Sequence, residues 1–188
     1  MVTQNRAQLQ AIILRLEAEL ASARADVATL MTQLEIDAGT GVSNRHGLHR
    51  AFQQMVARCS RGQSPCVLVI IDIDEFKQIN DTLGHAIGDR ALSDFAAFLT
   101  SHVRVNDCVA RIGGDEFAIL FDGMDLASAS RKMTALRLIE RGSDLVPGFS
   151  FSFGICNITA DAAFDAIFND ADSAMYADKI ARRRPTTL

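Results

Sequence analysis

The sequence predicts an α+β domain, in which helices cover a mixed central sheet, preceded by a separate N-terminal helix. Three observations predict this class. The first 36 residues carry an apolar heptad repeat, a near-continuous apolar run (CVLVIIDID) begins at residue 66, and two short apolar segments flank GGDE at 113–116. Strands mixed with helices, including one tight hairpin, are typical of a sheet with helices packed on it.

The N-terminal segment, residues 1–36, is predicted to be one helix without Gly or Pro. Its apolar residues alternate by steps of four and three over about four heptads. They are Leu9, Ile13, Leu16, Leu20, Ala23, Val27, Leu30 and Leu34. A lone helix would leave this stripe in water, so a coiled-coil dimer is favoured, and a helix folded back on its own domain is the alternative.

Residues 37–44 (DAGTGVSN) interrupt the heptads and begin a globular domain, residues 37–188. A helix is expected over 45–60, and the apolar run at 67–73 predicts a central strand buried on both faces. The remaining expected elements are a short helix or turn at 75–81, a glycine-containing loop at 83–89, a helix at 89–103, strands at 108–112 and 117–121, a helix at 125–141, a strand at 149–156 and a helix at 161–183.

Composition excludes several classes of protein. A net charge of −4 disfavours a surface for a nucleic acid polymer. The four cysteines form no CxxC pair, which disfavours zinc and disulfides and indicates a reducing compartment. No apolar run reaches the roughly 18–20 residues of a membrane span, and the N-terminus lacks a signal-peptide pattern. We therefore expect a cytoplasmic protein with no membrane partner.

Carboxylates gather at two places in the predicted sheet. Asp72 and Asp74 end the strand at 67–73, where an acid is costly unless it binds something positive. If the hairpin neighbours this strand, its turn brings Asp115 and Glu116 towards Asp72. Such oxygen ligands suit Mg²⁺. Taken alone, DID is a solvated acidic turn and GGDE an ordinary hairpin turn, so the combination of the two carries the prediction.

RIGGDEF at 111–117 together with VIIDIDEFKQINDTLGHAIGDRAL at 69–92 resembles the GGDEF family of diguanylate cyclases. The resemblance covers essentially Asp37 to Arg184, although Gly39 replaces a usual leucine and Arg182 a usual glycine. It implies a palm-like nucleotidyl-cyclase fold. It also implies the condensation of two GTP molecules into cyclic di-GMP, with release of two pyrophosphates and dependence on Mg²⁺ or Mn²⁺.

Carried over residue by residue, the resemblance implies that Asp72 and Asp115 bind the metal with help from the Ile73 carbonyl. Glu116 would hold a second metal or assist deprotonation of the attacking 3′-hydroxyl. Asn80 and Asp89 would recognise guanine, and the alternative is that they only form helix caps and turns. Lys77, Lys179 and Arg183 would neutralise the triphosphate, and the alternative is that they are solvated cations on helix faces. The substrate-binding residues implied are Lys77, Asn80, Asp89, Gly113, Gly114, Lys179 and Arg183.

Arg104 and Asp107 form an RxxD pattern five residues before GGDEF. This spacing resembles the family's inhibitory site, where the product cyclic di-GMP binds away from catalysis. Arg131 and Arg137 are both candidates for a further arginine at this site, and the sequence does not choose between them.

One such domain offers one nucleotide site, so the active unit is expected to be a two-fold homodimer held by the coiled coil. Two other readings stay open. The chain could be a catalytically silent module that binds GTP or cyclic di-GMP, or a structural dimerisation protein in which the acids only form turns.

Overall fold

The computed structural model describes residues 10, 12–20, 22, 35–59, 64–141 and 150–183. The chain divides into two compact units, Met1–Glu35 and Ile36–Leu188. In the first unit, residues 12–20 are helical and exposed, and the side chains of Ile13, Leu16 and Leu20 are 51%, 57% and 51% exposed. The other predicted heptad positions lie outside the described residues.

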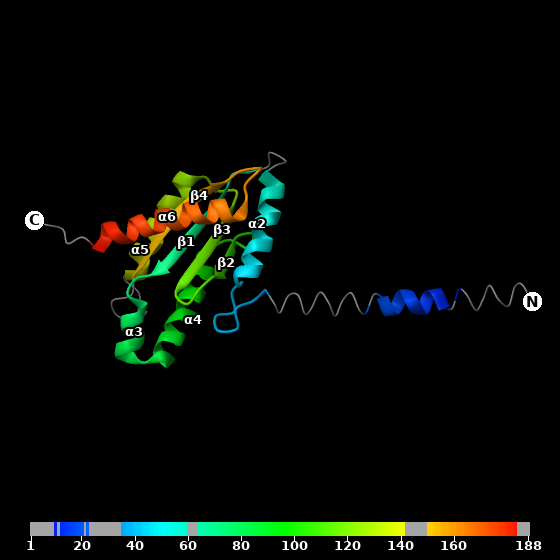
Figure 1. The fold of residues 1–188 in the computed structure, drawn as a ribbon, viewed down its shortest axis with the longest axis horizontal. Coiled ribbons are helices and arrows are strands. Elements are labelled where there is room, and N and C mark those ends of the chain that lie inside the picture. Colours follow the sequence, from blue (N-terminus) through cyan, green and yellow to red (C-terminus); the bar gives the residue numbers. More distant parts are fainter. Residues whose placement is uncertain are drawn as a thin grey trace, which may run out of the picture. The chain divides into compact units, whose positions relative to one another are not determined.

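The second unit contains the elements of the sheet and its covering helices (Figure 1). In chain order they are α2 (Arg45–Cys59), β1 (Cys66–Ile73), α3 (Phe76–Leu83), α4 (His85–Ser101), β2 (Cys108–Arg111), β3 (Glu116–Asp122), α5 (Leu126–Arg141), β4 (Phe151–Ile158) and α6 (Phe164–Arg183). The predicted α+β class and the predicted hairpin of β2 and β3 are confirmed.

The strands are arranged in the order β2-β3-β1-β4. The three strand pairings are all antiparallel, and a parallel contact occurs as an isolated bridge between Ser43 and Ala110. The α+β class is thus confirmed, whereas the described strands form an antiparallel sheet and not the predicted mixed one. All residues of β1 are buried, which confirms the prediction of a central strand covered on both faces.

Two apolar layers form because successive side chains of a strand point to opposite faces. Val67, Val69 and Ile71 of β1 pack with α4 and α5. Leu68 and Ile70 pack on the other face with α2 and α6, as Figure 1 shows for the helices. The sheet therefore lies between two helical layers, and the side chains at the ends of its strands lie at the rim of both layers.

One predicted loop is wrong. Residues 83–89 contain the end of α3, the single linking residue Gly84 and the first turn of α4. Gly84 has φ +86°, which glycine adopts without strain and which reverses the chain direction in one residue. Gly88 is instead helical and buried, and an added Cβ there would lie 1.9 Å from Oδ1 of Asn80. The second glycine thus permits the close approach of α3 and α4.

Among the described residues, no helix is both long enough and apolar enough to span a membrane.

Candidate active site

Asp72 and Glu116 lie opposite each other in the pairing of β1 with β3. Side chains at such positions project from the same face, with Cβ atoms about 4.5–5.5 Å apart. The face is the one covered by α2 and α6, since Leu68 and Ile70 on the same side of β1 pack there. The predicted neighbourhood of strand and hairpin is therefore confirmed, and it brings two carboxylates together at the end of β1.

The turn between β2 and β3 contains Asp115 and the two glycines. The Ile73 N–H donates to the Asp115 carbonyl oxygen at 3.1 Å, which holds the turn against the end of β1. An added Cβ at Gly113 would lie 2.5 Å from Oε2 of Glu116, whereas at Gly114 it would meet nothing within 4 Å. Gly113 thus leaves space for the Glu116 carboxylate, and Gly114 borders open space.

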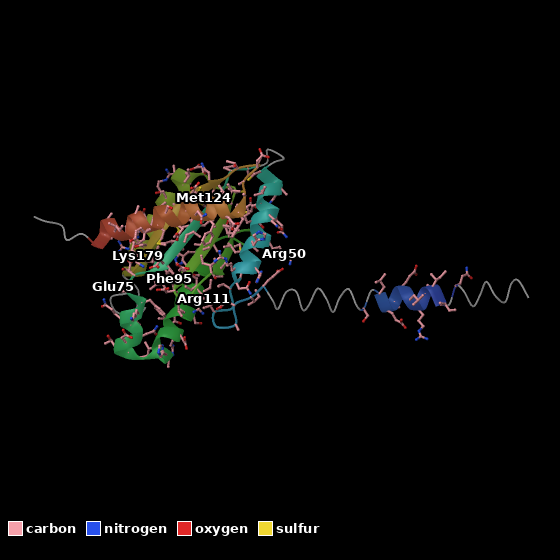
Figure 2. All side chains as sticks on the ribbon, in the orientation of Figure 1. Arg50, Glu75, Phe95, Arg111, Met124 and Lys179 are labelled. Atoms are coloured by element: carbon pink, nitrogen blue, oxygen red, sulfur yellow. The ribbon has the colours of Figure 1, made fainter. Side chains whose placement is uncertain are left out.

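Lys179 of α6 supplies a cation to this acidic end. Its ammonium group donates to Oδ1 of Asp72, and the Asp72 side chain is 10% exposed. Figure 2 shows Lys179 on α6 near the end of the sheet that also carries Glu75 and Arg111, with Met124 at the opposite end. The predicted site residue Lys179 therefore meets the predicted site residue Asp72.

The pKa values of both opposed carboxyls are raised. Burial raises the pKa of Glu116, and the negative charges of Asp72, Asp115 and Asp172 raise it further. Burial also raises the pKa of Asp72, against the effect of the Lys179 hydrogen bond. We call Asp72, Asp115, Glu116 and Asp172 the acidic cluster; together they place more negative charge here than Lys179 balances.

The donor chemistry of the acidic cluster fits a divalent cation, because adjacent carboxylates repel one another unless positive charge is bound. Within the described part of the chain, however, no set of three Asp, Glu, His or Cys side chains forms a ready metal site. That arrangement is compatible with Mg²⁺, which commonly takes one or two carboxylates and completes its shell with water and substrate phosphates.

Asp74 directly follows β1, and three side chains donate hydrogen bonds to it. Its carboxylate accepts hydrogen bonds from the hydroxyls of Ser150 and Ser152, both at 2.7 Å, and from Nη1 of Arg182 at 2.6 Å. Asp72 and Asp74 therefore have different partners: the first pairs with Lys179 and the second with Arg182.

Arg111, the last residue of β2, holds the glycine turn through its guanidinium group. Nε and Nη2 donate to the Gly114 carbonyl oxygen at 3.2 and 2.8 Å, and Nη1 donates to Oδ1 of Asp37 at 3.3 Å. The same Asp37 oxygen accepts from the backbone and hydroxyl of Thr40. One guanidinium thus joins the turn of the acidic cluster to the segment that precedes α2.

The predicted nucleotide residues lie on the helices that follow β1. Asn80 of α3 lies against Gly88 of α4, directly before Asp89, so the predicted guanine readers lie at one helix junction. Asp89 is exposed, as is Lys77 on α3. Arg183 is the last residue of α6, and its side chain is not described.

The predicted inhibitory pair is arranged as a turn. The Asp107 carboxylate accepts from the N–H of Arg104 at 2.8 Å and from the N–H of Asp122 at 3.0 Å. Arg104 is exposed. Of the two further arginines, Arg137 is committed to Asp178 at 2.6 Å, whereas Arg131 is exposed on α5.

The sequence pattern of the family described as "Diguanylate cyclase, GGDEF domain" matches residues 34–185. This chain belongs to that GGDEF family. Among curated proteins, diguanylate cyclase DgcP of Pseudomonas aeruginosa is 33% identical over 186 residues, which cover 94% of this chain and 27% of DgcP. The chain spans a quarter to a half of the length of the curated relatives it matches.

Solved GGDEF structures share the fold. The coiled coil and GGDEF domain of DgcB from Caulobacter crescentus, solved with cyclic di-GMP, has a TM-score of 0.78 at 24% identity and covers 93% of this chain and 96% of its own. A microbial GGDEF domain, solved in a novel interaction mode with cyclic di-GMP, has a TM-score of 0.73 at 28% identity, with 81% and 94% covered.

The GGDEF site includes residues that the sequence prediction missed. Asp172 lies seven residues before Lys179, two helical turns away on the same face of α6, and this spacing was a usable signal. Arg111 stands directly before the glycine turn in RIGGDEF, but nothing in the sequence pairs it with Asp37. The pair of Asp74 with Arg182 joins residues far apart in the chain, so its contact required the fold.

Proposed function

We propose that this GGDEF domain is an active diguanylate cyclase that condenses two GTP molecules into cyclic di-GMP and two pyrophosphates. The observation that carries the proposal is the meeting of Asp72 and Glu116 across β1 and β3, beside the glycine turn and Lys179. Asp72 and Asp115, with the Ile73 carbonyl, would hold Mg²⁺ or Mn²⁺. A bound divalent ion would supply positive charge for the triphosphate and the leaving pyrophosphate.

The chain's own groups then have definite roles. Glu116, whose pKa burial and the neighbouring acids raise, is suited to accept the proton of the attacking 3′-hydroxyl. A bond forms between that oxygen and the α-phosphorus of the second GTP, and the bond from this phosphorus to the bridging oxygen of pyrophosphate breaks. Gly114 lets the nucleotide approach the backbone, and Lys77, Lys179 and Arg183 would neutralise phosphate oxygens.

The same proposal includes recognition of the guanine base by Asn80 and Asp89. These residues lie where α3 meets α4, and the two helices follow β1 directly in the chain. A carboxylate can accept hydrogen bonds from both N1–H and the N2 amine of guanine, and adenine presents neither donor there.

We propose the cytoplasm as the compartment, which agrees with the four free cysteines.

Each domain presents one acidic cluster, so two chains must face each other to join two GTP molecules. We propose a homodimer through the N-terminal helix, supported by the exposed heptad residues Ile13, Leu16 and Leu20.

We further propose product inhibition at Arg104 and Asp107. Arg131 is the better candidate for the additional arginine, because Arg137 is held by Asp178 and stacks on Phe153 with its guanidinium carbon 4.2 Å from the ring centroid.

The test separates the cyclase from the silent binding module. The purified chain is freed of bound cyclic di-GMP and incubated with GTP and Mg²⁺, the nucleotides are separated, and GTP binding is measured in parallel on Glu116→Gln. We expect cyclic di-GMP from the parent alone and GTP binding by both. Binding without turnover in a dimeric parent would favour the module, and absence of both would contradict the nucleotide site.

A further inference from the structure

Arg182 joins two parts of the fold beside the acidic cluster. Its Nη1 donates to Oδ2 of Asp74 at 2.6 Å and to the Phe151 carbonyl oxygen at 2.5 Å. The Arg182 and Asp74 side chains are 21% and 18% exposed, so the pair is largely shielded from water.

The Phe151 carbonyl lies on β4, an outer strand of the described sheet β2-β3-β1-β4. Edge strands leave backbone groups in need of partners. Arg182 covers the Phe151 carbonyl, and Asp178 accepts from the Phe153 N–H at 3.1 Å. The last part of α6 is thus fastened to the edge of the sheet at two positions four residues apart.

Lys179 lies between Asp178 and Arg182, the two residues of α6 that hydrogen-bond to β4. Two acids at the end of β1 are divided between two cations, Asp72 with Lys179 and Asp74 with Arg182. If Arg182 were absent, Asp74 would keep its negative charge with two serine hydroxyls as partners. A poorly compensated charge in such a shielded place is unfavourable, so the end of α6 would be held less firmly against the sheet and Lys179 would leave Asp72 more often.

We propose that Arg182 is a positioning residue that keeps Lys179 at the acidic cluster, by neutralising Asp74 and by anchoring the end of α6 to β4. There the ammonium pairs with Asp72 in the free protein and is within reach of a phosphate when GTP and its divalent ion bind. Arg182 acts through Lys179, since its own guanidinium is turned to Asp74 and Phe151. The effect on catalysis rests on the proposed cyclase function, whereas the effect on the Lys179 contact does not.

The contact is tested by amine acylation. The chain has three lysines, Lys77, Lys132 and Lys179, so trace acetic anhydride labelling of the full chain followed by mass spectrometry reports on each. We expect Arg182→Ala to raise the labelling rate of Lys179 several-fold, to leave Lys77 and Lys132 unchanged, and Arg182→Lys to restore part of the protection. Unchanged or slower labelling of Lys179 would overturn the proposal. Faster labelling of all three lysines would indicate general loosening and would overturn it as well.

A double-mutant cycle tests the catalytic effect. KM and kcat for GTP are measured for the parent, Arg182→Ala, Lys179→Ala and the double variant. Arg182→Ala is expected to lower kcat/KM roughly two- to tenfold in the parent and to have no further effect without Lys179. Effects that multiply in the double variant would overturn action through Lys179. A parent that makes no cyclic di-GMP would contradict the proposed function, and the labelling result would still decide the role of Arg182.

Discussion

Asp72 and Glu116 face each other across β1 and β3, and both carboxyls have raised pKa values. The nearby Lys179 compensates only part of the charge of the acidic cluster. In the free protein such a pair is a source of instability, and bound positive charge relieves it. A strongly acidic, half-buried strand end is therefore better explained by ligand binding than by folding.

The raised pKa of Glu116 gives a prediction about stability. Because the folded chain binds this proton more tightly than the unfolded chain, stability falls as pH rises from near the ordinary value of 4.5 through the raised value. At neutral pH without divalent ions, Glu116→Gln should therefore raise Tm by about 1–3 °C. The gain should vanish below about pH 3.5, where the carboxyl is almost fully protonated in both states.

Scanning calorimetry across pH measures this difference, with Asp161→Asn as a control because Asp161 is an exposed acid. A lower Tm for Glu116→Gln at neutral pH would show that Glu116 stabilises the free fold, and the electrostatic account would be wrong.

Arg111 should be needed for the geometry of the turn. Its two donors on the Gly114 carbonyl and its third on Asp37 require a planar fork, which lysine lacks. We expect both Arg111→Ala and Arg111→Lys to lower kcat roughly 10- to 100-fold, as small displacements of reacting groups do. Steady-state cyclase kinetics measure this. Arg90→Ala is the matched control, because the Arg90 side chain is 83% exposed. Full activity of Arg111→Lys would show that the forked hydrogen bonds of Arg111 are not needed for the geometry of the turn.

Substitutions of Arg104 and Asp107 should have different effects on stability and on product inhibition. Asp107→Ala removes the acceptor of two backbone N–H groups and should cost about 1 kcal/mol of unfolding free energy, like the loss of a cap. Arg104→Ala should change stability by less than about 0.5 kcal/mol and raise the cyclic di-GMP concentration that halves activity. Urea unfolding and inhibition curves measure the two effects. Inhibition of Arg104→Ala equal to that of the parent would remove Arg104 from the site.

The exposed heptad stripe predicts a dimer that can be broken by charge. Leu16→Glu places a carboxylate in the proposed seam and should yield monomers with activity reduced at least roughly tenfold, because two sites must meet. Ala18→Glu on the opposite side of the same helix is the control. Sedimentation equilibrium and activity per chain measure both. A Leu16→Glu variant that remains dimeric and active would mean that other surfaces join the two domains.

Much of the fold was predictable because its signals are local. The unbroken apolar run of β1 and the glycine hairpin at 113–116 specify two neighbouring strands, and the alternation of side chains then places Asp72 on the same face as Leu68. The glycines of residues 83–89 misled the prediction, because Gly88 serves a close contact with Asn80 inside a helix. A sequence does not distinguish that use of glycine from a loop.

The contacts of the site were less predictable than its residues. Lys179 was identified, but its pairing with Asp72 depends on the approach of α6 to the sheet. Arg182 and Asp74 are more than a hundred residues apart, and nothing in either segment specifies their contact. Such long-range pairs follow from tertiary packing, which only the three-dimensional structure contains.

The most direct test of the central claim is the stoichiometry of the reaction. GTP, cyclic di-GMP and pyrophosphate are quantified over time for the parent and for Glu116→Gln at the same dimer concentration with Mg²⁺. We expect the parent to consume two GTP for each cyclic di-GMP and to release two pyrophosphates, and the variant to form no cyclic di-GMP while it still binds GTP. Equal rates of cyclic di-GMP formation by the two proteins would contradict the assignment of the Asp72 and Glu116 face as the site of condensation.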